Sequence, residues 1–288
     1  MTKMKNLKMS QLALCNFPYK KYSLDYALDH LQALGAKKIE FYAADPHFSL
    51  FDCGLDDMKR VARKLKERNL QVIDICPENC TYPVNLASKN PATRKHTFDY
   101  YVTAIHAAAE WGAPFCNVFP GWANIDGSQE EAWRYGVDAL MALADIAQDN
   151  GVRIVLEATS AIDTVLSSSA KAVQMKREVS SPALTSLIDT LCLDIMGETM
   201  EQAISTIGIE NVSHIHFSDG AQLPGGGWEH RVPGEGNEDL ETMVATLDKY
   251  NYQGVLGCEV TISTEKSSDP DIVMRKTMEW CRERFISD

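Results

Sequence analysis

Hydrophobic positions in this chain form short apolar runs that alternate with longer segments in which apolar residues recur every three or four positions. The runs are typical of buried β-strands, and the longer segments are typical of amphipathic helices. The predicted strands are Met9–Cys15, Lys38–Tyr42, Gln71–Cys76, Phe115–Phe119, Arg153–Thr159, Leu184–Thr190, Val212–Ser218 and Gly254–Val260. The predicted helices are Asp25–Leu34, Leu55–Arg68, Ala92–Trp111, Gln129–Asp149, Ala170–Glu178, Thr199–Ile207, Leu240–Tyr250 and Asp271–Phe285.

This alternation predicts an α/β fold with a parallel sheet, and the eight repeats favour a (β/α)8 TIM barrel that forms a single domain over residues 1–288. Ser23 is expected to cap the first helix, and Gly112 and Gly151 to end the third and fourth. An open doubly wound sheet is the alternative, but it normally places a glycine-rich phosphate-binding turn after an early strand, and the sequence has none. The Gly220–Asp239 segment is expected to be the longest irregular loop, on the face where barrel active sites lie.

Four predicted strands each carry a metal-binding type of residue near the end. These residues are Glu157, Asp189, His216 and Glu259. A lone carboxylate at the end of a buried strand is expensive, and a shared divalent cation removes that cost. Three carboxylates and one imidazole suit Mn²⁺, Co²⁺ or Mg²⁺, and we expect one ion per chain. For any single carboxylate, the alternative is a helix cap or a partner of an arginine.

Glu157 and Glu259 are the predicted catalytic pair, because strands five and eight would bring their carboxylates to one substrate from different sides. Removal of a proton next to a carbonyl needs a base, and its return on the other face needs an acid. A metal that chelates the carbonyl and an adjacent hydroxyl would stabilise the enediolate charge.

Two histidines and one aspartate nearby allow more than one interpretation. His214 and His216 are two residues apart, so on a strand they face the same way. We expect His214 to be a core histidine whose partner is the backbone. His230, in the long loop, either contacts substrate, orients a ligand or is solvated. Asp219 either binds substrate or caps the loop.

Two further loops are expected at the barrel mouth. Glu78, Asn79 and Tyr82 follow strand three and have the chemistry to hydrogen-bond sugar hydroxyls, although the residues alone favour a proline-rich surface turn. Phe119 and Trp122 follow strand four and either line the substrate or simply pack.

Composition excludes several other classes. The formal net charge is −12, so nucleic acid is not an expected partner. The sequence has no apolar run long enough for a membrane span and no signal-peptide pattern behind Met1. Eight cysteines without an export signal predict reduced thiols and a cytoplasmic location. No G-x-S-x-G, HExxH, GxGxxG or GxxxxGK[ST] motif is present.

Taken together, these residues resemble the xylose-isomerase-like barrel superfamily, in the branch of sugar isomerases and epimerases related to D-tagatose 3-epimerase and fructoselysine 3-epimerase. The resemblance spans the chain. It rests on Val-Leu-Glu157, Leu-Ile-Asp189, His-Ile-His216, Cys-Glu259-Val, the Pro77–Leu86 stretch and the His230–Gly236 stretch. It implies that the four strand-end residues bind one Mn²⁺ or Co²⁺ and that the two glutamates exchange the substrate proton.

The departures from this resemblance are informative. Tagatose-type enzymes place a histidine three residues after the metal-binding aspartate and an arginine six residues after the metal-binding histidine. Here these positions are Cys192 and Gln222, which argues against a simple ketohexose. The endonuclease IV branch uses three zinc ions held by additional histidines, and this chain lacks those histidines.

The leading hypothesis is therefore a metal-dependent epimerase or isomerase that acts on a small carbohydrate, of the ketose or fructoselysine 3-epimerase type. A lyase with the same site, acting on inososes or 3-keto sugars, is the alternative. A non-catalytic sugar-binding subunit is a third possibility. Relatives in this superfamily imply a homo-oligomer, either a dimer or a tetramer.

Overall fold

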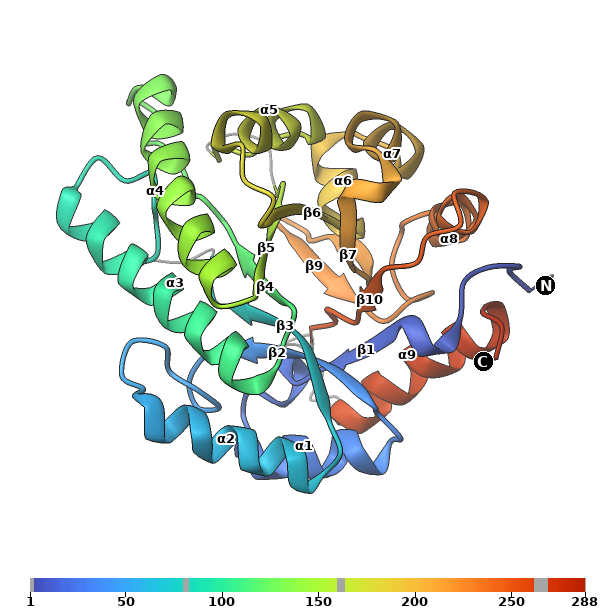
Figure 1. The fold of residues 1–288 in the computed structure, drawn as a ribbon. Helices are drawn as coiled ribbons and strands as arrows, with labels where there is room; N and C mark the ends of the chain where they lie inside the picture. The colour runs from blue at the N-terminus through green and yellow to red at the C-terminus, as the bar shows by residue number, and fades with distance from the viewer. Residues whose placement is uncertain (1–2, 80–82, 160–163, 262–268, 288) are drawn as a thin grey trace.

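The computed structural model describes residues 3–79, 83–159, 164–261 and 269–287. Within these residues, eight parallel strands close into a barrel in the spatial order β1-β10-β7-β6-β5-β4-β3-β2, and helices surround it (Figure 1). The barrel strands are β1 Leu12–Cys15, β2 Lys38–Ala43, β3 Gln71–Pro77, β4 Phe115–Val118, β5 Arg153–Glu157, β6 Leu184–Asp189, β7 Val212–His216 and β10 Val255–Gly257. The predicted (β/α)8 TIM barrel is confirmed.

The helices of the described residues lie where the hydrophobic period placed them, with one addition. They are α1 Leu24–Ala33, α2 Leu55–Glu67, α3 Pro91–Trp111, α4 Gln129–Asp149, α5 Ser169–Val179, α6 Thr190–Met196, α7 Met200–Ile207, α8 Leu240–Lys249 and α9 Pro270–Arg284. Ser23 caps α1 by accepting a hydrogen bond from the Tyr26 amide at 3.3 Å. Gly112 ends α3 in the left-handed conformation, which a glycine adopts without steric cost.

Helix packing against the barrel follows the amphipathic pattern. In α2, for example, Met58, Val61 and Leu65 recur on one face and are buried, while the charged residues between them face solvent. Burial of each such side chain stabilises the fold by about 1.5–3 kcal/mol. The apolar core therefore forms between the strands and the helices, which leaves the strand ends free for polar residues.

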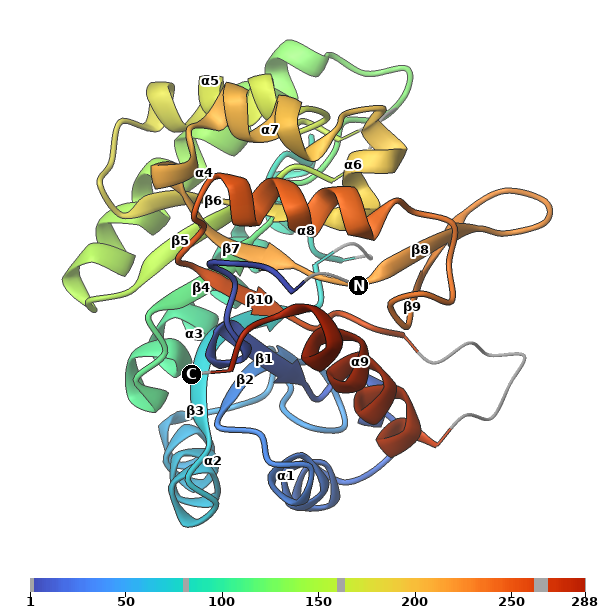
Figure 2. The same ribbon diagram turned by 90° about the vertical axis from the view of Figure 1, so that its right-hand side faces the viewer.

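Two elements differ from the sequence predictions. The Gly220–Asp239 segment is not simply irregular, because β8 (Asp219–Gln222) and β9 (Trp228–Arg231) form an antiparallel hairpin with Ala221 opposite Glu229. Figure 2 shows this hairpin extending from one end of the barrel. The short helix α6 begins directly at the end of β6, where only a strand end was expected.

The two ends of the described chain pack together and close the barrel. The Met4 amide donates to the Arg284 carbonyl at 2.7 Å, and the Met9 amide donates to the Ile286 carbonyl at 3.0 Å. The strand β1 then pairs in parallel with β10, so that Ala13 lies opposite Gly257. In the described part of the chain, no helix is both long and apolar enough to cross a membrane.

Candidate active site and metal centre

Strand register brings the four predicted ligands to one end of the barrel. Glu157, Asp189 and His216 are the last residues of β5, β6 and β7, and Glu259 lies two residues beyond β10. Asp189 pairs with His216 across β6 and β7, and Gly257 pairs with His216 across β10 and β7. One ligand atom from each residue lies within 4.8 Å of the others.

The His216 ring lies at the centre of this group. Its Nδ1 atom is 2.8 Å from Glu259 Oε2 and 3.4 Å from Glu157 Oε1. Strands β5 and β10 are separated by β6 and β7 in the barrel, so the two glutamates reach this atom from different walls. All four residues are buried except Glu259, which is partly exposed.

Three carboxylates concentrated in this space repel one another. Burial raises the pKa of Asp189 to about 7, and the charges of Glu259 and Glu157 add to the rise. Burial also raises the pKa of Glu259, but the facing His216 and His230 outweigh this effect and hold that pKa below its usual range. Within the described part of the chain, the ion pairs of these three carboxylates are all with histidines.

This donor set fits a divalent cation. Glu259 Oε2 and His216 Nδ1 are buried and lack an aligned hydrogen-bond partner among the described residues. Asp189 also caps α6, since its Oδ1 accepts from the Leu191 amide at 2.7 Å, but Oδ2 accepts a weak bond from the Cys192 thiol at 3.5 Å and lies 3.9 Å from His230 Nε2. The helix cap proposed as an alternative for a strand-end carboxylate therefore holds for one oxygen of Asp189 and leaves the other available as a ligand.

A pair of amides that the sequence analysis did not connect orients Glu157. The Asn117 side chain, on β4, donates to Glu157 Oε2 at 2.8 Å, and Asn79 donates to Asn117 Oδ1 at 2.8 Å. This leaves Glu157 Oε1 directed toward His216. The sequence signal for Asn117 was a polar residue inside the apolar run of β4, on the strand adjacent to Glu157.

The hairpin carries His230 to the ligand group. Its Nε2 lies 3.9 Å from both Asp189 Oδ2 and Glu259 Oε2, and its Nδ1 lies 2.8 Å from Ser218 Oγ. Thr261 donates to the His230 carbonyl at 2.7 Å and ties β9 to the segment after β10. His230 is therefore placed beside the site, and its contact with substrate stays a prediction.

Asp219 braces the hairpin and the loop that follows. Its Oδ1 accepts from the amides of Gly220 and Glu238, and its Oδ2 accepts from those of Gly234 and Gly236, all at 2.8–3.1 Å. These four donors occupy both carboxylate oxygens. Of the two roles considered for Asp219, the structure displays the loop cap, and substrate binding stays a prediction.

The remaining predicted substrate residues differ in their surroundings. Glu78, just after β3, is half-buried and accepts a hydrogen bond from the Tyr42 hydroxyl. Phe119 is buried and lies against the partly exposed Trp122, with ring centroids 6.3 Å apart. Tyr82 lies outside the described residues.

His214 differs from its expected environment. It is buried, as expected, but the prediction of a backbone partner is wrong, because its Nε2 lies 2.6 Å from Glu40 Oε2 on β2. The two histidines of β7 do face the same way, since His216 Nε2 lies 3.2 Å from the same oxygen.

Comparison with known proteins gives this geometry a context. The chain is 27% identical over 153 residues to D-psicose 3-epimerase of Agrobacterium fabrum (strain C58 / ATCC 33970), covering 51% of this chain and 50% of that protein. It is 25% identical over 162 residues to inosose isomerase of Bacillus subtilis (strain 168), covering 51% of this chain and 58% of that protein. The chain thus spans about half the length of the curated relatives it matches.

Solved structures match over a greater length. The crystal structure of 3-keto-D-glucoside 4-epimerase from E. coli superimposes with a TM-score of 0.77, covering 95% of this chain and 99% of that one at 19% identity. At that identity the match supports the fold alone. The family model described as "Xylose isomerase-like TIM barrel" matches residues 28–284, and the chain belongs to that family.

Proposed function

We propose that this protein is a divalent-metal-dependent carbohydrate epimerase or isomerase of the ketose or fructoselysine 3-epimerase type. The observation that carries the proposal is the approach of Glu157 and Glu259 to the same atom of His216, at 3.4 Å and 2.8 Å, from strands on different walls of the barrel. A substrate carbon held between them has a carboxylate within reach on two sides.

The residues divide the work as follows. One glutamate removes the proton next to the substrate carbonyl, and the other returns a proton to the same or the neighbouring carbon. Asn117 donates a hydrogen bond to one oxygen of Glu157, which leaves the other oxygen to face the substrate. Glu157, Asp189, His216 and Glu259 would hold one Mn²⁺, with Co²⁺ or Mg²⁺ as substitutes. That ion would polarise the substrate carbonyl and offset the negative charge that develops on oxygen.

Several weaker predictions accompany this assignment. Glu78, Tyr82, Phe119, Trp122, Asp219 and His230 remain the predicted substrate contacts. A cytoplasmic location and a homodimer or homotetramer also remain predictions. The names of the similar proteins, a psicose epimerase, an inosose isomerase and a keto-glucoside epimerase, support a small polyol or sugar as substrate.

The decisive experiment is proton NMR in D₂O with Mn²⁺-activated enzyme, from which metal is stripped before each spectrum. The substrates are ketoses, fructoselysine and 3-keto glycosides. We expect deuterium to replace the proton next to the carbonyl, with a new isomer and no released fragment. Glu157→Gln and Glu259→Gln should each lower this exchange by about 10²–10⁴-fold. Glu235→Gln, an exposed carboxylate paired with Lys276, is the matched control and should leave exchange unchanged. Near-normal turnover by Glu157→Gln would refute the proposal.

A lyase acting on inososes or 3-keto sugars is the second candidate. It is favoured by Cys192, whose buried thiol lies 3.5 Å from Asp189 Oδ2, and by the exposed Gln222 on β8. Both occupy positions where tagatose-type enzymes have sugar-binding residues. Release of water or an aglycone in the same NMR experiment would establish the lyase and displace the epimerase.

A further inference from the structure

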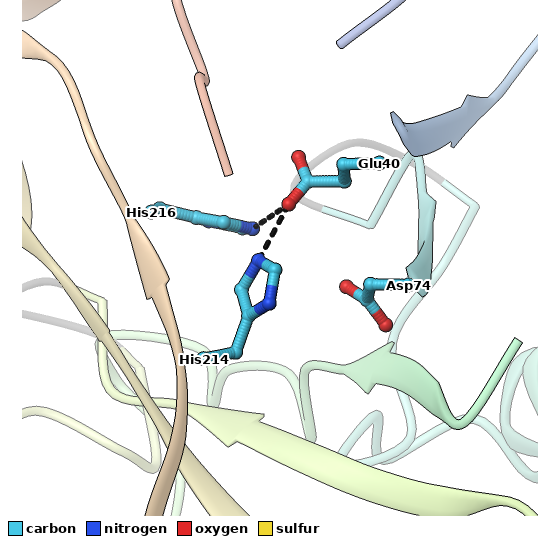
Figure 3. A group of neighbouring side chains, drawn as sticks. All are labelled: Glu40, Asp74, His214 and His216. Carbon is cyan, nitrogen blue, oxygen red and sulfur yellow. Dashed lines mark hydrogen bonds and ion pairs between the residues drawn. The ribbon is translucent and has the colours of Figure 1, made fainter. Parts of the chain in front are cut away.

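A second polar group lies inside the barrel beneath the metal ligands. It consists of Glu40 on β2, Asp74 on β3, and His214 and His216 on β7, none more than 1% exposed. Figure 3 shows one oxygen of Glu40 between the two imidazole rings, with the Asp74 carboxylate facing the same space. Carboxylates are almost never fully buried unless they have a partner, so this group requires a physical explanation.

Glu40 is the centre of the group. Its Oε2 accepts a hydrogen bond from His214 Nε2 at 2.6 Å and lies 3.2 Å from His216 Nε2. The latter contact is within ion-pair distance but is not aligned as a full hydrogen bond. His216 therefore faces carboxylates at both of its ring nitrogens. Nε2 lies beside Glu40, and Nδ1 lies beside Glu259 and Glu157.

Strand β10, which is separated from β2 by β1 alone, restricts where the Glu40 carboxylate can lie. Gly257 on β10 is so close that an added Cβ would lie 2.2 Å from Glu40 Oε2 and 2.8 Å from His214 Nε2. Any side chain at this position would displace the carboxylate or the ring. Glycine at 257 and the bond from His214 together keep Oε2 beside His216.

A cation bound among these four residues is the competing explanation. Two ligand atoms that share an ion at about 2.0–2.2 Å each lie ~2.9 Å or more apart. The 2.6 Å between Glu40 and His214 is shorter than that and is closer to the ~2.7–2.9 Å of a charge-assisted N–H···O hydrogen bond. His216 would also have to give one nitrogen to each of two ions. The geometry thus favours a direct carboxylate–imidazole contact.

We infer that Glu40 is a positioning residue that holds His216 through Nε2 and so presents Nδ1 to the metal at the barrel mouth. The inference rests on the proposed metal-dependent function. A ligating histidine whose second nitrogen contacts a carboxylate has its ring orientation and its proton position fixed, and loss of such a partner commonly costs 10–100-fold in metal affinity. His214 assists by holding the Glu40 oxygen that His216 contacts.

The first test measures Mn²⁺ affinity and stoichiometry by calorimetry on chelator-stripped protein. Glu40→Leu keeps the approximate volume but removes the acceptor, and we expect its dissociation constant to rise 10–100-fold. Glu40→Gln retains an acceptor oxygen and should recover most of that loss. Asp74→Asn is the matched control, because Asp74 is equally buried in the same group but forms no hydrogen bond with His216; its affinity should stay within about threefold. Each titration is made where circular dichroism shows the variant to be folded.

The second test is read on the wild-type protein and uses a variant only to assign signals. Histidine labelled with ¹⁵N, in protein loaded with ¹¹³Cd²⁺, should show metal coupling at Nδ1 of His216 and a proton on Nε2. The His216 signals are assigned by their loss in His216→Asn. Metal coupling at Nε2, or a proton on Nδ1 of the loaded protein, would overturn the inference.

The outcomes separate this inference from the function on which it rests. Absence of any metal binding by the wild type would refute both. Normal wild-type binding with an equal affinity in Glu40→Leu would refute only the positioning role. Two ions per chain, with one lost in Asp74→Asn, would show that the buried group is a second cation site and would also refute it.

Discussion

At the scale of single residues, Glu238 shows how much an unpaired carboxylate costs here. Both of its oxygens are buried and lack a hydrogen-bond partner among the described residues. Burial raises its pKa to about 8, and the negative charges of Asp189 and Asp219 contribute to the rise. The folded metal-free protein therefore holds a proton on Glu238 over a pH range in which the unfolded chain, with a pKa near 4.5, has lost it.

The sign of the pH dependence follows from this difference. The folded state binds more protons than the unfolded state between about pH 4.5 and pH 8, so this carboxyl lowers stability as the pH rises through that window. We predict that Glu238→Gln stabilises the metal-stripped protein by ~1–3 kcal/mol at pH 8, discounted for partial exposure, and has little effect at pH 4.5. Thermal melts at several pH values measure this. An equal gain at both pH values, or the same gain in Glu235→Gln, would contradict it.

Residue chemistry also explains which parts of the site could be predicted. Glu157, Asp189, His216 and Glu259 are carboxylates or imidazoles where apolar strands end, and they do converge. Glu40 and Asp74 sit inside apolar runs on other strands, and neither suggested chemistry, because only the closed barrel brings them near the histidines of β7. The strand-end ligands were identified by asking why a charged residue lies in a buried apolar run. The same question asked of Glu40 and Asp74 would have identified both residues.

At the scale of elements, periodic patterns predicted the long helices best. The predicted bounds of α4, Gln129–Asp149, agree with the structure at both ends. The β8–β9 hairpin was missed because its strands are short, its sequence lacks apolar alternation, and its turn contains Gly225, Gly226 and Gly227. The hairpin is stabilised by hydrogen bonds between residues far apart in sequence. Asp219 accepts from the amides of the following loop, and Thr261 donates to the His230 carbonyl.

The hairpin should therefore depend on Asp219. We predict that Asp219→Ala removes the acceptor for four backbone amides and destabilises the loop by about 2–4 kcal/mol, because the donors are left without their partner. Hydrogen exchange should accelerate at Gly234, Gly236 and Glu238. Asp239→Ala, which removes only the cap of α8, is the control and should cost about 1 kcal/mol with little change at these glycines. Unchanged exchange in Asp219→Ala would show that the loop is held by other contacts.

At the scale of the whole molecule, the candidate metal centre joins four consecutive strands of the barrel. Strands β5, β6 and β7 each contribute one ligand, the segment just after β10 contributes Glu259, and β10 in turn pairs with β1 to close the ring. A bound ion would link segments separated by more than a hundred positions along the chain. Because such a site is assembled only in the folded state, its binding free energy adds to the free energy of unfolding.

Metal removal should therefore lower the stability of the entire barrel. We predict that Mn²⁺ at 100 times its dissociation constant stabilises the protein by ~2.7 kcal/mol, which is about 4–5 °C in melting temperature for a chain of this size, and that a chelator reverses the gain. The gain should shrink as the pH falls below about 7, because Asp189, whose pKa is raised to about 7 by burial and by Glu259 and Glu157, must lose its proton to bind the ion. The double variant Glu157→Gln/Glu259→Gln is the control and should melt at the same temperature with and without Mn²⁺. An equal rise in the melting temperature of that variant would show that the stabilising ion binds elsewhere. No rise in the wild type would refute the proposed metal centre.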